Sequence, residues 1–180
     1  MIGASRIAPV LALALALAAT GCGYSTESLM PAGVDRMAVD VFENDTFYRE
    51  IEFGLTRELT GELRQRTRVA VVTRSHADAV LTGRITSVGR PTLVTSPRDL
   101  VSEQGVILTA RVSLTDPRDG REIAGFIVRN RAEFVVERGE TLESAFAEAS
   151  RDLAEQIVDR LEDASFRRQL DALRTGRGDG

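Results

Sequence analysis

Two apolar stripes with helical spacing dominate the pattern of this chain. Between residues 48 and 66, apolar side chains recur at every fourth position, at Ile51, Leu55, Leu59 and Leu63. From about Gly139 onward a longer stripe recurs at spacings of three and four, at Leu142, Phe146, Ala149, Leu153, Ile157 and Leu161. Such spacing places the side chains on one face of a helix. We therefore expect two amphipathic helices, with a frayed continuation of the second to about residue 173.

Strand patterns occupy the sequence around these stripes. Segments that are rich in β-branched residues, or that alternate between apolar and polar positions, lie at 36–42, 68–73, 77–88, 105–115 and 121–136. The last two are separated by Asp116-Pro117-Arg118-Asp119-Gly120, which is typical of a hairpin turn. The segment 89–104 contains Pro91, Pro97 and several polar residues. It favours a long loop or an irregular edge.

A helix with one apolar stripe can cover one face of a sheet. The order of the elements therefore predicts an α+β fold, a two-layer sandwich with both amphipathic helices packed on one face of a four- to five-stranded sheet. We expect this sheet to be mixed and mostly antiparallel. Its other face would be open to solvent, with polar members that include four arginines: Thr82, Arg84, Thr86, Thr109, Arg111, Ser113, Arg129 and Arg131.

This predicted open face permits two interpretations. An antiparallel sheet with one covered face normally has a polar, solvated second face, which needs no binding partner. Alternatively, guanidinium groups bind phosphate and carboxylate in a bidentate manner, so the same face would suit a partner protein or anionic head groups. The candidate contact residues on it are Arg84, Arg111, Arg129 and Arg131.

The N-terminus has the three-part layout of a secretory signal. Arg6 is followed by an apolar run from Ile7 to Ala19, which is shorter than the roughly 20 apolar residues that span a bilayer. Cys22 follows Gly21 as in a lipobox, where the cysteine is acylated and becomes residue one, although Ala19 stands where leucine is usual. The alternative is a secreted protein with a stray thiol. We expect a signal peptide over 1–21, a lipidated tether over 22–35, one domain over 36–173 and a disordered tail over 174–180.

Charge and composition narrow the possible partners. Removal of residues 1–21 takes one arginine from the 23 basic residues and none of the 27 acidic ones, so the formal charge of −4 becomes −5. An acidic chain argues against a general nucleic-acid binder. Lysine is absent from the sequence, which fits either codon bias or selection for bidentate arginine contacts. Cys22 is the single cysteine, so the core and not a disulfide must stabilise the domain.

Reactive groups are sparse in this chain. His76, in Ser75-His76-Ala77-Asp78, is the single histidine, and neighbours so close in sequence are not presumed to be partners in a catalytic triad. Only carboxylate clusters remain for a metal, and Glu43-Asn44-Asp45 lacks the spacing of a calcium loop. Glycine-rich phosphate loops are also absent. We expect no metal, no cofactor and no enzymatic activity, and we interpret the chain as a binding or assembly protein.

A series of short motifs resembles the lipopolysaccharide-assembly lipoprotein family, LptE. In order, these are Gly21-Cys22-Gly23-Tyr24, Met30-Pro31, Met37-Ala38-Val39, Phe42-x-Asn44-x-Thr46, Ile51-Glu52, Leu55-Thr56-x-x-Leu59 and Ala77-Asp78-Ala79-Val80-Leu81-x-Gly83-x-Ile85. No single motif is specific, but their order and spacing extend over roughly Cys22 to Leu161. The resemblance implies a non-catalytic, two-layer α/β domain at the periplasmic side of the outer membrane.

The resemblance further implies a place inside the lumen of the β-barrel translocon LptD. There the chain would help the barrel assemble and assist the insertion of lipopolysaccharide into the outer leaflet. Contacts in the family are a broad surface and a few basic residues, and on this basis we select Arg98 in the segment 89–104 and Arg129. Because lysine is absent, every basic contact with lipopolysaccharide would be made by arginine.

Two other classes of function stay open at the level of sequence. One is a different outer-membrane lipoprotein, which regulates a cell-envelope enzyme or a secretion pore. That protein would co-purify with a soluble or inner-membrane enzyme, whereas a barrel plug would co-purify with one large β-barrel. The other class is a periplasmic hydrolase, whose activity would have to depend on His76 or on a carboxylate.

Overall fold

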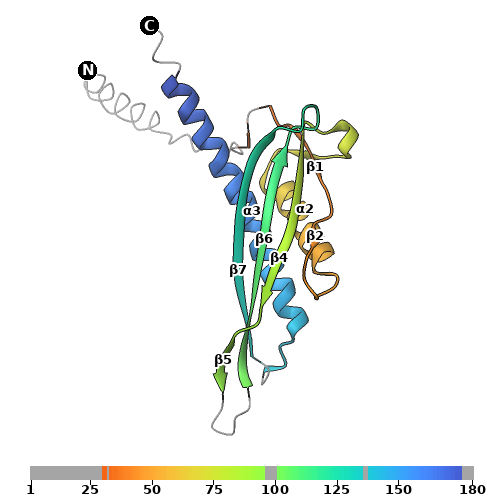
Figure 1. The fold of residues 1–180 in the computed structure, drawn as a ribbon, viewed down its shortest axis with the longest axis vertical. Coiled ribbons are helices and arrows are strands. Elements are labelled where there is room, and N and C mark those ends of the chain that lie inside the picture. Colours follow the sequence, from red (N-terminus) through yellow and green to blue (C-terminus); the bar gives the residue numbers. More distant parts are fainter. Residues whose placement is uncertain (1–29, 32, 96–100, 136–137, 176–180) are drawn as a thin grey trace, which may run out of the picture.

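The computed structural model describes residues 30–31, 33–95, 101–135 and 138–175. In this part of the chain, two helices lie on the same side of one sheet (Figure 1). The helices are α2 (Ile51–Arg66) and α3 (Leu142–Thr175), and the 3-10 turn η1 spans Arg74–His76. The strands are β1 (Arg36–Val39), β2 (Glu43–Asn44), β3 (Ala70–Val71), β4 (Ala79–Gly89), β5 (Thr92–Thr95), β6 (Val101–Thr115) and β7 (Glu122–Val135). The predicted two-layer α+β fold is confirmed.

The sheet is parallel at one edge and antiparallel at the other. Its strands follow the order β3-β1-β4-β6-β5, with β2 beside β4 and β7 beside β6. β1 pairs in parallel with both β3 and β4, whereas β4, β6 and β7 are antiparallel neighbours. The described sheet has seven strands, more than the four to five predicted, because β2 and β5 were not recognised as strands.

The core lies between the two helices and the face of the sheet that they cover. The predicted stripe of α2 is buried, and Leu55, Leu59 and Leu63 have no exposed surface. α3 adds Leu153, Ile157 and Leu161, and the sheet adds alternate residues of β6: Val106, Leu108, Ala110, Val112 and Leu114. Burial of each leucine-sized side chain contributes about 1.5–3 kcal/mol. This packing is the main source of stability in the described domain.

One close contact fixes how the chain before α2 packs against β4. The ring of Phe42 occupies the space that a Cβ atom at position 83 would need, so only glycine fits there. Phe42 is 2% exposed, and its backbone N–H donates a 3.1 Å hydrogen bond to Thr56 Oγ1 of α2. The requirement for Gly83 is therefore steric, since its φ is not positive.

Of the two structures predicted for 89–104, the long loop is wrong and the irregular edge is confirmed. β4 continues to Gly89, and β5 (Thr92–Thr95) is an edge strand that pairs with β6 through two register shifts. The sequence Thr-Leu-Val-Thr has high β propensity. Pro91 lies before β5, where the missing N–H costs no ladder hydrogen bond.

A β-bulge limits the alternation predicted for 77–88. The register of β4 against β6 shifts between Ile85 and Ser87, so that Ser87 instead of Thr86 pairs with Thr109. An extra residue in one strand inverts the alternation that follows it. Thr86 stays exposed and donates from Oγ1 to the Thr109 carbonyl at 3.3 Å. Thr86 is therefore exposed as predicted, but the alternation is inverted after it, so that Ser87 is exposed and Val88 packs against the core.

Both ends of the described region are more ordered than the sequence pattern predicted. α3 continues to Thr175, and near its C-terminus it projects beyond the sheet (Figure 1). At the other end, Met30 and Val34 are buried in the core at 8% and 7% exposure. Among the described residues, no helix has the length and hydrophobicity needed to cross a bilayer.

Candidate functional site

The candidate site is the uncovered face of β4, β6 and β7, which we call the open face. Strand register arranges its residues in three rows: Arg84–Arg111–Ile127, Ser87–Thr109–Arg129 and Gly89–Ile107–Arg131. Arg84 and Arg111 are directly opposite each other, and Arg111 and Arg129 are diagonal neighbours, which places their Cβ atoms within roughly 8 Å. The structure thus brings together the four arginines that the sequence predicted for this face.

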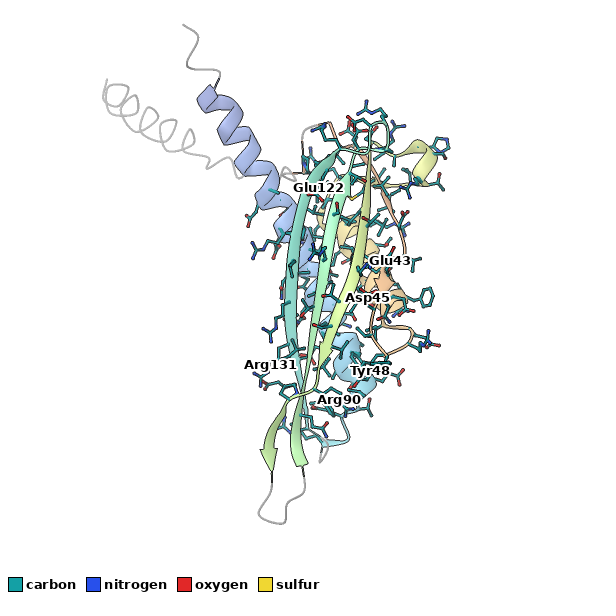
Figure 2. All side chains as sticks on the ribbon, viewed as in Figure 1. Glu43, Asp45, Tyr48, Arg90, Glu122 and Arg131 are labelled. Carbon is teal, nitrogen blue, oxygen red and sulfur yellow. The ribbon has the colours of Figure 1, made fainter. Side chains whose placement is uncertain are left out.

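The two outer arginines of the open face are paired with acids. Arg84 forms an ion pair with Glu43 of β2, its register partner, and its Nη1 lies 3.5 Å from Asp45 Oδ2. Arg131 Nη2 lies 3.0 Å from Glu133 Oε1. Figure 2 shows Glu43 and Asp45 beside β4, and Arg131 at the opposite edge on β7. These exposed pairs contribute at most about 1 kcal/mol each, but they neutralise the outer charges.

The two central arginines are not neutralised in this way. Arg111 and Arg129 are both exposed, and neither side chain forms a hydrogen bond or ion pair with another residue that the structure describes. The nearby acid Glu122 accepts a 2.7 Å hydrogen bond from Ser113 Oγ. The centre of the open face therefore presents two uncompensated guanidinium groups to solvent.

Ile127, which sequence reasoning missed, adds an apolar side chain to this centre. It is 57% exposed and is the register partner of Arg111. The signal was present in the sequence, because the alternation that directs Ala124 and Val128 inward directs position 127 outward. Arginine is enriched in contact surfaces, whereas a single exposed aliphatic side chain is normal on a folded protein, so the candidate site rests on the arginines.

Two of the predicted functional residues cannot be placed. These are Cys22, the expected lipidation site, and Arg98, the basic contact residue expected in the segment 89–104. Both lie outside the described residues. Their roles stay predictions. In the described part of the chain, no group of three His, Cys, Asp or Glu side chains is placed to hold a metal ion.

His76 and its neighbours do not form a Ser-His-Asp arrangement. His76 Nδ1 lies 3.1 Å from both Thr73 Oγ1 and Ser75 Oγ on the exposed turn η1. Asp78 instead accepts hydrogen bonds from Arg36, at 2.8 Å from Nη2 to Oδ1 and 3.2 Å from Nε to Oδ2. These side-chain hydrogen bonds lower the pKa of Asp78 from its ordinary value. Asp78 therefore joins the start of β1 to the start of β4.

The Phe42-x-Asn44-x-Thr46 motif organises the loop between β2 and α2. Asn44 Nδ2 donates to the Tyr48 carbonyl at 2.6 Å and to Glu52 Oε2 at 2.7 Å. Asn44 Oδ1 accepts from the backbone N–H and the hydroxyl of Thr46. α2 begins at Ile51 and not near residue 48, because Glu50 has a left-handed φ of 71° that no α-helix can include. The Asn44 network holds a loop whose Phe47 side chain is 100% exposed.

The comparisons with known structures agree with the fold. An uncharacterized lipoprotein B from Nitrosomonas europaea matches with a TM-score of 0.53 at 14% identity, over 73% of this chain and 84% of that chain. A protein from Xanthomonas campestris matches with a TM-score of 0.52 at 13% identity, over 80% and 91%. A hypothetical protein from Chlamydia trachomatis gives 0.51 at 12%, over 72% and 96%. At these identities the likeness concerns the fold alone.

The comparison with protein families identifies the chain more closely. A search of curated proteins gave no significant match. A family model described as LptE, lipopolysaccharide-assembly, matches residues 34–161, from the first core residues before β1 to the buried part of α3. Because this match covers most of the sequence, including the Asn44 loop and the Gly83 contact, the chain belongs to the LptE family of lipopolysaccharide-assembly proteins.

Proposed function

We propose that this protein is a lipoprotein of the outer membrane, attached to the periplasmic leaflet through acyl chains on Cys22. It occupies the lumen of an LptD-type β-barrel, helps that barrel assemble and assists the insertion of lipopolysaccharide into the outer leaflet. It acts by binding and without catalysis. Family membership supports the general role in lipopolysaccharide assembly. The LptD-type barrel as partner, the periplasmic leaflet as location and the acyl anchor on Cys22 are our additions to that role.

The observation that carries the proposal is the pair of uncompensated arginines at the centre of the open face. Arg111 and Arg129 are exposed, lie on neighbouring strands and have no acidic partner among the described residues. Guanidinium groups bind carboxylates and phosphates in bidentate geometry. A barrel wall supplies carboxylates and lipopolysaccharide supplies phosphates, so either would complete this surface.

Charge reversal at these two positions tests the proposal. In the full-length lipoprotein, R111E/R129E should reduce the amount of LptD-type barrel that co-purifies after detergent extraction by about tenfold, which corresponds to about 1.4 kcal/mol of binding free energy. Arg84 and Arg131 are left unchanged because their acidic partners would become unpaired. The melting temperature should change little, since both side chains are solvated.

The matched control applies the same charge change to the helices. Arg64 and Arg151 are exposed on α2 and α3, and R64E/R151E should leave co-purification unchanged. Equal losses in both double variants would contradict a specific role for the open face.

Recovery of a soluble or inner-membrane enzyme in place of a barrel would favour the regulatory function instead. Absence of a palmitate label on the wild type, with Cys22→Ser as the unlabelled control, would contradict the lipid anchor.

A further inference from the structure

A groove runs between the N-terminal halves of α2 and α3, in the layer that covers the sheet. It has a volume of about 670 Å³ and is lined by apolar side chains that include Phe53, Leu142 and Phe146. Phe53 is 58% exposed, and the ring of Phe146 packs at 5.1 Å, centroid to centroid, against Tyr48. The groove is therefore a concave, partly aromatic surface on the opposite layer from the open face.

A buried hydroxyl group in this groove has no hydrogen-bond partner within the described residues. Ser150 of α3 is 3% exposed and lines the groove, and its side chain forms no interaction with another residue that the structure describes. A buried polar group without a partner costs about 1–3 kcal/mol. A bound molecule that offers a hydrogen-bonding group at this position would remove that cost.

The floor of the groove contains a glycine that the fold itself does not require. Gly54 lies inside α2, and a Cβ atom built there meets nothing within 4 Å. Glycine in a helix interior costs about 0.5–1 kcal/mol relative to alanine. The absence of a side chain at Gly54 allows another backbone to approach α2 closely.

The remaining polar groups favour a peptide over an anionic lipid. The charged residues that line the groove are two arginines and three glutamates: Arg49, Arg57, Glu50, Glu58 and Glu143. Arg57 Nη2 lies 3.6 Å from Glu58 Oε1, and the set carries a formal charge of −1, so it suits a neutral or weakly basic chain better than a phosphate head group. α2 also begins without a side-chain cap, which leaves amide donors of its first turn, near the groove, for a carbonyl.

We propose that this groove binds a peptide segment of a partner protein. An apolar side chain of the segment packs among Phe53, Leu142 and Phe146, and its backbone approaches over Gly54 and bonds to Ser150. The segment is neutral or weakly basic. The site lies on the helix layer, so it goes beyond the proposed function of the open face and would let the protein contact two partners at once.

Site-specific photo-crosslinking in intact cells tests the inference. A benzoylphenylalanine at Ala147, which is exposed and lines the groove, should crosslink to one continuous segment of a partner protein. The control position is Glu155, which is exposed on α3 outside the groove. A synthetic copy of the crosslinked segment then serves as the ligand for affinity measurements with the full-length lipoprotein in detergent.

Two glycines of α2 provide matched variants. Gly61 also has open space around it, but it does not line the groove. G54L and G61L should both raise the melting temperature, since leucine favours the helix. G54L should weaken binding of the segment by about tenfold or more, and G61L should leave binding unchanged.

Four results would overturn the inference. These are a lipid adduct at Ala147, an adduct with a second copy of this chain, no adduct at all, or equal loss of binding in G54L and G61L. The experiment is independent of the open face, because R111E/R129E should leave the Ala147 adduct intact. In R111E/R129E, unchanged barrel binding with an intact adduct would count against the open face alone, whereas reduced barrel binding with no adduct in the wild type would count against the groove alone.

Discussion

The two faces of the sheet are built from the same strands, but different forces act on them. On β6, Leu108, Ala110 and Val112 face the helices and are at most 1% exposed. Thr109 and Arg111, each one residue away, face solvent on the other side. A change on the covered face must disturb a packed core, whereas a change on the open face disturbs little of the fold. Substitutions on the open face can therefore test binding without disturbing the fold.

The largest effect is expected for Gly83→Val on the covered face. The new side chain would collide with the ring of Phe42, and overpacking of a filled core costs about 3 kcal/mol. Urea unfolding measures this loss. In a Phe42→Ala background the same change should cost much less, as a double-mutant cycle would show. Additive losses from the two changes would mean that the contact does not determine the identity of residue 83.

A smaller loss is expected for Asn44→Ala, which removes the centre of the loop before α2. Its amide makes four hydrogen bonds within residues 44–52, and loss of such a network costs about 1–3 kcal/mol. Unfolding of the variant measures this cost. Phe47→Ala in the same loop is the control and should change stability by less than about 0.5 kcal/mol, since Phe47 is fully exposed. Equal effects would refute the role of Asn44.

The ion pair between Arg36 and Asp78 should make stability depend on acid pH. The hydrogen bonds from Arg36 hold the pKa of Asp78 below its ordinary value of 3.8. A carboxyl whose pKa is lowered by folding contributes stability that is complete above its unfolded pKa. This contribution is lost as the pH falls from 3.8 through the lower folded pKa.

Unfolding of the wild type and of Asp78→Asn, followed as the pH is lowered below 3.8, measures this dependence. The variant should lose less stability in acid than the wild type. Some acid dependence should persist, because Arg118 lowers the pKa of Asp116 in the same way. Identical profiles for the two proteins would show that the pair does not contribute.

The smallest effect is expected on the open face. Arg84 and Arg111 are directly opposite each other on β4 and β6, but Glu43 and Asp45 offset the charge of Arg84, so the repulsion between the two guanidinium groups is small. Arg111→Thr should therefore change the free energy of unfolding, measured in urea, by less than about 0.5 kcal/mol. A clear loss of stability would mean that Arg111 has a structural role and that the two faces are less distinct than we argue.

The main elements of this fold follow from local pattern. The stripe from Ile51 to Leu63 has one period and one consistent face, so the sequence predicts both the helix and its buried side. The alternation in β6 likewise places Arg111 outward. By contrast, the bulge near Thr86 depends on how two distant strands align, which no local pattern records. β5 was missed because Pro91 and Pro97, which flank it in the sequence, outweighed a four-residue strand pattern.

The candidate site was predicted only in part. Strand alternation placed Arg84, Arg111, Arg129 and Arg131 on one face, and the structure agrees. The pairing of Arg131 with Glu133, two residues along β7, follows from the same alternation. The pairing of Arg84 could not be predicted, because Glu43 belongs to a strand of two residues that pairs with β4. The groove at Ser150 could not be predicted from the sequence either, because it is formed only where α2 packs against α3.

The length and direction of β4 determine how far the domain would extend from the proposed lipid anchor on Cys22. β1 pairs with the start of β4 near Ala79, whereas the β5–β6 hairpin follows the other end at Gly89. At about 3.3 Å per residue, the 11 residues of β4 span roughly 35 Å, close to the roughly 30 Å of bilayer hydrocarbon. The proposed acyl chains on Cys22 are eight residues before Met30, so they would be attached nearer to the Ala79 end. With β4 along the membrane normal, the β5–β6 hairpin would then lie about one hydrocarbon thickness away from the Ala79 end.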